Sequence, residues 1–177
     1  MFIDEEAVRE GIALFKPDLV ICPFLKQRIP DDICKRHTCI IIHPGIKGDR
    51  GPSSLDWAIL DGIEEWGVTA VQAAPDWDAG DIWATAQFRM RETPKASLYR
   101  HEVTEASLKV IFETIARFEQ GDFKPEPLDY SRADVTGAWR SAVRQVDRRI
   151  DWRSDTTDTV LRKIHSGYRP DCCKNIL

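Results

Sequence analysis

The stretch that most restricts the fold is TCIII, residues 38–42, an apolar and largely β-branched run without alternating polar side chains. A strand with this pattern is covered on both faces, as in the interior of a parallel sheet that has helices on its two sides. A second apolar run, residues 17–24, begins with Pro17 and Asp18 and predicts another buried strand. We therefore expect both runs in one sheet whose two faces are covered.

Segments with helix signals alternate with the strand-like runs. These signals are apolar residues at helical spacing, or a Pro, Ser or Asp that can start a helix. Ser53 or Ser54 is expected to cap one of these helices. The alternation predicts an α/β fold with an open, mostly parallel, Rossmann-like sheet. The expected helices cover residues 4–15, 29–37, 53–66 and 95–120, and two later strands are expected over residues 67–74 and 81–90.

A chain of 177 residues fits one domain, or one domain and the start of another. We expect the first domain over residues 1–121 and a Pro-rich, polar linker over residues 122–148. Residues 149–177 then start a second domain, with a helix that Asp151 or Ser154 caps. Because the chain begins on a helix pattern instead of a strand, we expect the first domain to be truncated at its N-terminus.

The composition argues against two classes of partner. The chain has 25 Lys and Arg against 29 Asp and Glu, a net charge of −4, whereas nucleic-acid binding usually requires a basic surface. The apolar runs are far shorter than the roughly 20 residues that span a bilayer, and the acidic start MFIDEEAVRE does not resemble a secretory signal. The sequence predicts a cytoplasmic protein without a nucleic-acid or membrane partner.

The five cysteines do not predict a metal site or a disulfide. The spacings between Cys22, Cys34 and Cys39 match no zinc pattern, and Cys172 and Cys173 are adjacent. Cys22 and Cys39 lie inside apolar runs, so we interpret them as small residues of the core.

His43 is the first candidate for chemistry, because it stands where the run CIII ends and the loop HPGIKGDRGPSS begins. In an open α/β sheet, ligands bind outside the carboxyl ends of the strands. Gly45 and the later glycines of this loop permit a close approach of the backbone to a ligand. Two alternatives stay open: a histidine that is hydrogen-bonded to its own loop, and a loop whose N–H groups and Arg50 hold an anion.

The second candidate is Asp78 in APDWDAGDIW, residues 74–83, between two expected strands. Its carboxylate can pair with His43 and orient the imidazole. Such a pair, with no Ser or Cys nucleophile beside it, indicates proton transfer without a covalent intermediate. The alternative is that acidic residues simply populate a turn, and this is the interpretation that we favour from the residues alone for Asp76 and Asp81.

The motifs IIHPGI, GPSSLDWAILDG, EWGVTAVQA and DAGDI, in this order and spacing, resemble the folate-dependent formyltransferases over residues 17–120. A closer resemblance is to the formyltransferase-like amino-terminal region of the HypX (HoxX) family of hydrogenase maturation factors. It is carried by CPFLKQRIPDDI, HPGIKGDRGPSSLDWAI, SLYRHEVTEAS and PEPLDYSRADV.

This resemblance implies transfer of the formyl group of 10-formyltetrahydrofolate to an acceptor, with coenzyme A as the expected acceptor. It also implies a downstream hydratase-like domain that releases carbon monoxide for a hydrogenase metal, and hydrogenase maturation proteins as partners. Carried over by motif, His43 and Asp78 match the catalytic residues of the family. The residues implied to bind the substrates are Phe24, Leu25, Ile41, Pro44, Gly45, Ala74, Pro75, Asp76 and Trp77.

One position departs from the family pattern. Ile41 stands where the family has an asparagine, and its side chain cannot donate a hydrogen bond to an oxyanion. Losing such a donor costs on the order of 10² to 10³ in rate unless another group replaces it. Three alternatives therefore accompany the enzyme hypothesis: a non-catalytic folate- or coenzyme A-binding module, an inactive or partner-dependent fragment, and another formyltransferase such as the methionyl-tRNA type.

Overall fold

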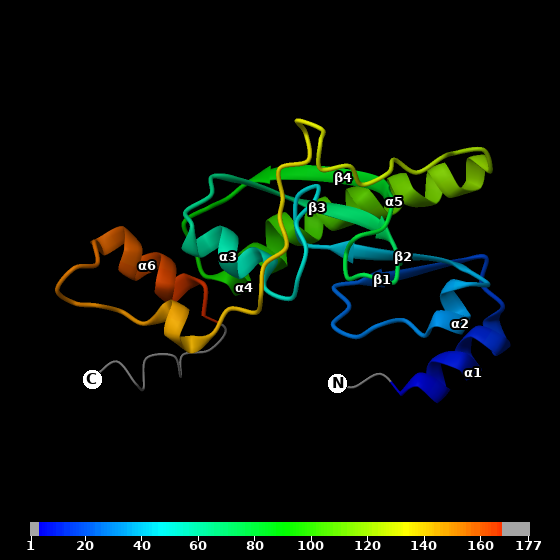
Figure 1. The fold of residues 1–177 in the computed structure, drawn as a ribbon, viewed down its shortest axis with the longest axis horizontal. Helices are drawn as coiled ribbons and strands as arrows, with labels where there is room; N and C mark the ends of the chain where they lie inside the picture. The colour runs from blue at the N-terminus through cyan, green and yellow to red at the C-terminus, as the bar shows by residue number, and fades with distance from the viewer. Residues whose placement is uncertain (1–3, 168–177) are drawn as a thin grey trace.

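The computed structural model describes residues 4–167, which fold around an open four-stranded sheet (Figure 1). The strand order is β1-β2-β3-β4. The strands are β1 Leu19–Pro23, β2 Thr38–His43, β3 Glu65–Gln72 and β4 Ile82–Arg89. The helices are α1 Glu5–Phe15, α2 Asp31–Cys34, α3 Ser54–Leu60, α4 Lys95–Leu98, the π-helix η1 Tyr99–Val103, α5 Thr104–Gln120, the 3₁₀ helix η2 Gln145–Arg148 and α6 Thr157–His165.

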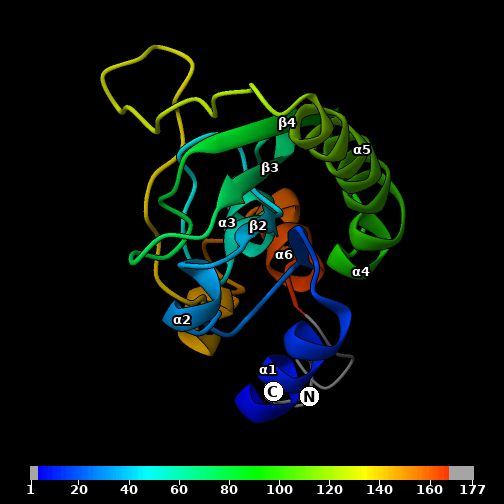
Figure 2. The same cartoon turned by 90° about the vertical axis from the view of Figure 1, so that its right-hand side faces the viewer.

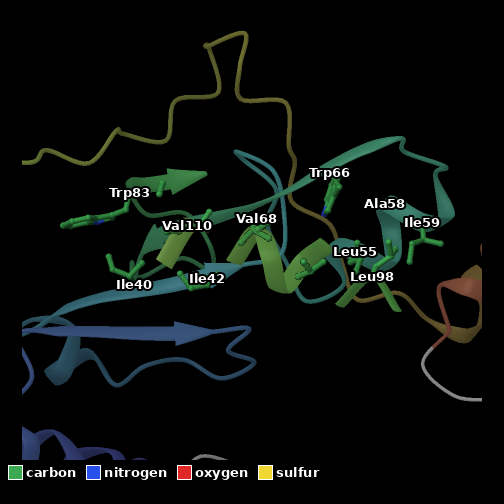
Figure 3. Packing of buried hydrophobic residues seen from close by; sticks show 14 residues of the cluster. Ile40, Ile42, Leu55, Ala58, Ile59, Trp66, Val68, Trp83, Leu98 and Val110 are labelled. Carbon is green, nitrogen blue, oxygen red and sulfur yellow. The ribbon is translucent and has the colours of Figure 1, made fainter. Parts of the chain in front are cut away.

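Strand β2 lies between two hydrophobic clusters, as its unbroken apolar sequence predicts. Ile40 and Ile42 are fully buried in the larger cluster, with Val110 of α5 (Figure 3). Cys39 and Ile41 point to the opposite face, where α1 and α2 pack. Helix α5 therefore covers one face of the sheet and the two N-terminal helices cover part of the other (Figure 2).

The α/β class and the open sheet are confirmed, but the sheet is mixed and not mostly parallel. Strands β1 and β2 pair in parallel, whereas β2–β3 and β3–β4 are antiparallel. Residues 73–81 connect β3 to β4, and a link of this length suits antiparallel neighbours, because a parallel pair needs a crossover of a dozen or more residues. An apolar run predicts that a strand is buried, but it does not predict whether the neighbouring strand is parallel or antiparallel.

The start of α3 differs from the prediction. Ser53 occupies the N-cap position, but its hydroxyl accepts a hydrogen bond from the backbone of Val143 instead of capping the helix. The hydroxyl of Ser54 donates to the carbonyl of Pro44 at 2.7 Å. Both serines therefore attach α3 to neighbouring segments. The helix also ends earlier than expected, at Leu60, before Gly62 adopts a φ of 68°.

The segment expected as one helix over residues 95–120 is helical throughout but contains the π-helix η1. It ends at Gly121, which has the left-handed conformation expected of a C-cap glycine. Helix α6 is capped by Thr156, whose hydroxyl accepts from the backbone N–H of Thr159 at 3.2 Å, and not by Asp151 or Ser154.

Among residues 4–167, the structure contains no helix with the length and apolarity needed to cross a membrane. The predictions about the last part of the second domain, including the pair Cys172 and Cys173, lie outside the described residues. Cys22, Cys34 and Cys39 are free thiols.

Candidate active site

His43 is the last residue of β2 and its ring lies between two aspartates. Its Nε2 atom is 2.8 Å from Oδ2 of Asp49, and its Nδ1 atom is 3.6 Å from Oδ2 of Asp78. The side chains of His43 and Asp49 are 5% and 3% exposed, and that of Asp78 is 10% exposed. A titratable ring is thus held between two buried carboxylates at the carboxyl end of an interior strand.

Two connections bring these three residues together. The loop from Pro44 to Ser53 returns to β2 and carries Asp49, while the loop of residues 73–81 carries Asp78. The hydroxyl of Thr69 on β3 donates to the carbonyl of Gly45 at 2.8 Å and fixes the first turn of the former loop. The site therefore depends on the antiparallel pairing of β2 with β3, which places Thr69 opposite His43.

The two loops also contact each other directly. The backbone N–H of Gly51 donates to Oδ2 of Asp78 at 3.2 Å, and Nε of Arg50 donates to the carbonyl of Trp77 at 2.7 Å. Asp78 has a φ of 50°, in the left-handed region that Asp tolerates better than most residues. Its turn requires Gly80, because a Cβ atom there would lie 1.8 Å from the carbonyl oxygen of Gln72. Small residues after Asp78 thus permit the tight return of the chain to β4.

A cavity of about 290 Å³ lies on the face of the sheet that carries Ile41. Ile41 lies two residues before His43 on β2, and Trp77 directly precedes Asp78. The cavity is lined by Gln27, Arg28, Ile29, Asp31, Cys34, Lys35, Ile41, Ala73, Ala74, Pro75, Asp76 and Trp77. The structure therefore places Ile41 and residues 74–77 in the lining of one cavity.

The remaining predicted contact residues do not line this cavity. Phe24 belongs to the core on the opposite face, where its ring meets Tyr99 edge-on at 5.6 Å. Leu25 lines a separate cavity of about 210 Å³ beside α1. The carbonyl of Pro44 accepts from the Trp66 indole at 3.0 Å. Gly45 lies against the ring of His43, where a Cβ atom would be 2.5 Å from Nε2.

The structure adds two features that the sequence reasoning missed, and the first is Asp49. The signal that could have found it is an acidic residue six positions after His43 in the same glycine-containing loop. The loop geometry brings its carboxylate to the ring nitrogen that Asp78 does not face.

The second feature is the segment of residues 126–143, which we call the strap. It lies within the expected linker but is hydrogen-bonded along the loop that carries Asp49. The Tyr130 hydroxyl donates to the carbonyl of Gly48, and the backbone N–H of Gly137 donates to the carbonyl of Lys47. The backbone N–H of Arg50 donates to the carbonyl of Ala138, and the backbone N–H of Arg140 donates to the carbonyl of Arg50. In Figure 1 the strap is the yellow segment that passes over β4 towards η2.

Ion pairs reinforce one end of the strap. The ammonium group of Lys47 contacts the carboxylates of Glu126 and Asp134 at 3.1 and 2.8 Å. Hydrogen bonds from Arg132 and from Lys47 hold the pKa of Asp134 well below its ordinary value. Burial lowers the pKa of Lys47, but these carboxylates raise it above its ordinary value overall. The loop that carries Asp49 is therefore anchored to the strap through both backbone hydrogen bonds and ion pairs.

Within residues 4–167, His, Cys, Asp and Glu side chains do not form a group of three or more arranged to hold a metal ion. A histidine between two carboxylates can transfer protons and can stabilise a developing negative charge.

Comparisons with known proteins identify the family and match the fold. Residues 3–115 match the family described as Formyl transferase. The hydrogenase maturation factor HoxX of Bradyrhizobium diazoefficiens is 48% identical over 165 residues, which are 93% of this chain and 29% of that protein. A methionyl-tRNA formyltransferase of Bacillus licheniformis is 27% identical over 85% of this chain and 47% of that protein.

A solved structure agrees with the sequence match to HoxX. The crystal structure of HypX from Aquifex aeolicus in complex with tetrahydrofolic acid has a TM-score of 0.85 and 46% identity to this chain. The match covers 93% of this chain and 28% of that one. The chain thus spans less than a third of the HoxX and HypX proteins that it matches.

Proposed function

Because the chain belongs to the formyl transferase family, we propose that it binds 10-formyltetrahydrofolate and transfers the formyl group to an acceptor. The observation that carries this proposal is His43, buried between two carboxylates, together with a cavity lined by Ile41 and residues 74–77, which are close neighbours of His43 and Asp78 in the chain. The HypX structure in complex with tetrahydrofolic acid supports a folate as the ligand in this proposal.

The proposed reaction needs no oxidant or metal. The nucleophile of the acceptor attacks the formyl carbon, the bond between that carbon and N10 of the folate breaks, and the proton of the nucleophile ends on N10. His43 stabilises the oxyanion that forms on the formyl oxygen, and Asp78 stabilises the charged ring and helps to relay the proton. Such acid–base groups typically contribute 10² to 10⁴ in rate.

We further propose coenzyme A as the acceptor and hydrogenase maturation as the context, where the product supplies a carbon monoxide ligand. The identity to HoxX supports this choice over a tRNA acceptor, and so does the net charge of −4. The free thiols Cys22, Cys34 and Cys39 suit the reducing cytoplasm in which we place the reaction.

The test is to incubate the full chain with 10-formyltetrahydrofolate and coenzyme A, and to measure the release of tetrahydrofolate and the formation of formyl-coenzyme A. We expect His43→Ala and Asp78→Asn to abolish the transfer. Asp81→Asn is the matched control, since Asp81 is exposed at the end of the loop that carries Asp78. A wild-type chain that consumes no formyl-folate would overturn the proposed activity.

A second candidate is a folate-binding module without catalysis, and the apolar side chain of Ile41 favours it. This residue lines the cavity but offers no donor for an oxyanion. Calorimetry with tetrahydrofolate separates the two functions, because binding without turnover supports the module.

We also propose the domain division expected from the sequence, with a first domain over residues 1–121 and a second that begins at residue 149. Limited proteolysis that cuts between residues 122 and 148 would support it. Resistance of this segment would instead support one unit that includes the strap.

A further inference from the structure

We propose that Asp49 is a positioning residue that holds His43 as the tautomer protonated on Nε2, so that Nδ1 faces Asp78 and acts in the reaction. The use of Nδ1 in catalysis rests on the proposed function. The assignment of the tautomer rests on geometry alone.

The shorter contact determines where the proton lies. A carboxylate only accepts hydrogen bonds, and a neutral imidazole has one N–H. Nε2 of His43 is 2.8 Å from Asp49, which is a hydrogen-bond distance, whereas Nδ1 is 3.6 Å from Asp78, which is too long for one. The N–H of the neutral ring therefore belongs on Nε2.

Close packing of the surrounding backbone maintains the contact between Asp49 and His43. Gly45 leaves space for it, because a Cβ atom at this position would lie 2.4 Å from Oδ2 of Asp49 and 2.5 Å from Nε2 of His43. The backbone N–H of Asp49 donates to the carbonyl of Ile46 at 3.0 Å. Gly137 of the strap packs so closely that a Cβ atom there would lie 1.9 Å from the Asp49 nitrogen. Loop and strap together fix the position of this carboxylate.

The longer contact leaves Nδ1 able to exchange a proton. No hydrogen bond to Asp78 has to break before Nδ1 accepts the proton of the acceptor or delivers it to N10 of the folate. Asp78 remains close enough to stabilise the charged ring that forms in between. The two aspartates thus have different tasks: Asp49 sets the orientation of His43, and Asp78 supports its charge.

The test is ¹⁵N NMR of the full chain labelled on histidine, at a pH at which the imidazoles are neutral. The spectrum of His43→Gln identifies the signals of His43. In the wild type and in the control Asp81→Asn, we expect a protonated Nε2 and an unprotonated Nδ1. In Asp49→Asn the new amide can donate to Nε2, so we expect the proton on Nδ1, facing Asp78.

Kinetics provide the second readout. The corresponding change of aspartate to asparagine in a Ser-His-Asp triad lowers kcat by about 10⁴ because the tautomer is wrong. We expect Asp49→Asn to lower kcat by a similar order, with little change in KM for the folate. Gly45→Ala should give the same loss while Asp49 keeps its charge, because the added methyl group separates the pair.

Two results would overturn the inference: an unchanged ¹⁵N pattern for His43 in Asp49→Asn, or wild-type kcat in that variant. Failure of the proposed function gives a different result, since then the wild-type chain itself transfers no formyl group. The NMR comparison still decides the tautomer in that case.

Discussion

Replacement of Asp56 by leucine is expected to lower the free energy of unfolding by about 3–5 kcal/mol. Asp56 on α3 accepts from the ammonium group of Lys95 at 2.7 Å and from the guanidinium group of Arg148. The side chains of Asp56, Lys95 and Arg148 are 11%, 8% and 14% exposed. Removal of the carboxylate leaves two cationic groups buried beside an apolar residue, which is the costly way to break a buried ion pair.

The magnitude can be measured by urea unfolding, followed by tryptophan fluorescence and by circular dichroism. In a domain of 150 to 250 residues, each kcal/mol shifts Tm by about 2–4 °C, so a fall in Tm of about 6–20 °C is expected as well. The matched control is Asp61→Ala. Asp61 pairs with Arg140 just beyond the same helix, but these side chains are 41% and 37% exposed, so the expected loss is below about 1 kcal/mol.

A second variant tests the physical reason. In Asp56→Leu combined with Lys95→Met, the ammonium group is removed together with its partner. The double variant should therefore be more stable than the single variant. The reasoning is refuted if Asp56→Leu is as stable as Asp61→Ala, or if the double variant is no more stable than Asp56→Leu.

Two further predictions concern glycines and thiols. Gly51→Ala should destabilise the chain by about 1–3 kcal/mol, because φ is 116° and a Cβ atom would lie 2.1 Å from the carbonyl oxygen of Arg140. Gly11→Ala, at an open helical position, should stabilise the chain by about 0.5–1 kcal/mol. Equal free energies of unfolding for the two variants in urea would contradict this prediction. Burial raises the pKa of Cys22 to about 11 and that of Cys39 to about 12. The unfolded thiols ionise near pH 9 while the folded ones stay protonated, so the free energy of unfolding should fall from pH 9 to 11 more steeply in the wild type than in Cys22→Ala/Cys39→Ala.

The sequence predicted the parts of the site that depend on local pattern. Residues 38–42 indicated a strand covered on both faces, and His43 at its end followed from the change to a glycine-containing loop. The small residues after Asp78 indicated a close turn, which Gly80 makes against Gln72. These features depend on neighbours in the chain, so a reading of the residues could find them.

Other features depend on contacts between distant residues. The antiparallel direction of β3 is set by pairing with β2, and an apolar run has the same pattern in either direction. In the sequence, Asp49 does not differ from other acidic loop residues, because its contact with His43 arises only from the folded loop. The strap resembled a linker because its Pro-rich, polar composition says nothing of backbone hydrogen bonds to residues 47–50.

The strap has a consequence for how sequences of this type can be recombined. The family match ends at residue 115, and a fusion junction near residue 121 would look natural from the helix boundary. Such a junction would exchange residues 126–143 together with the residues that follow them, and would remove the hydrogen bonds and ion pairs that support the loop of Asp49. A chimera joined at that point would thereby also change the surroundings of His43. A fusion junction that keeps His43 together with the strap lies after residue 143.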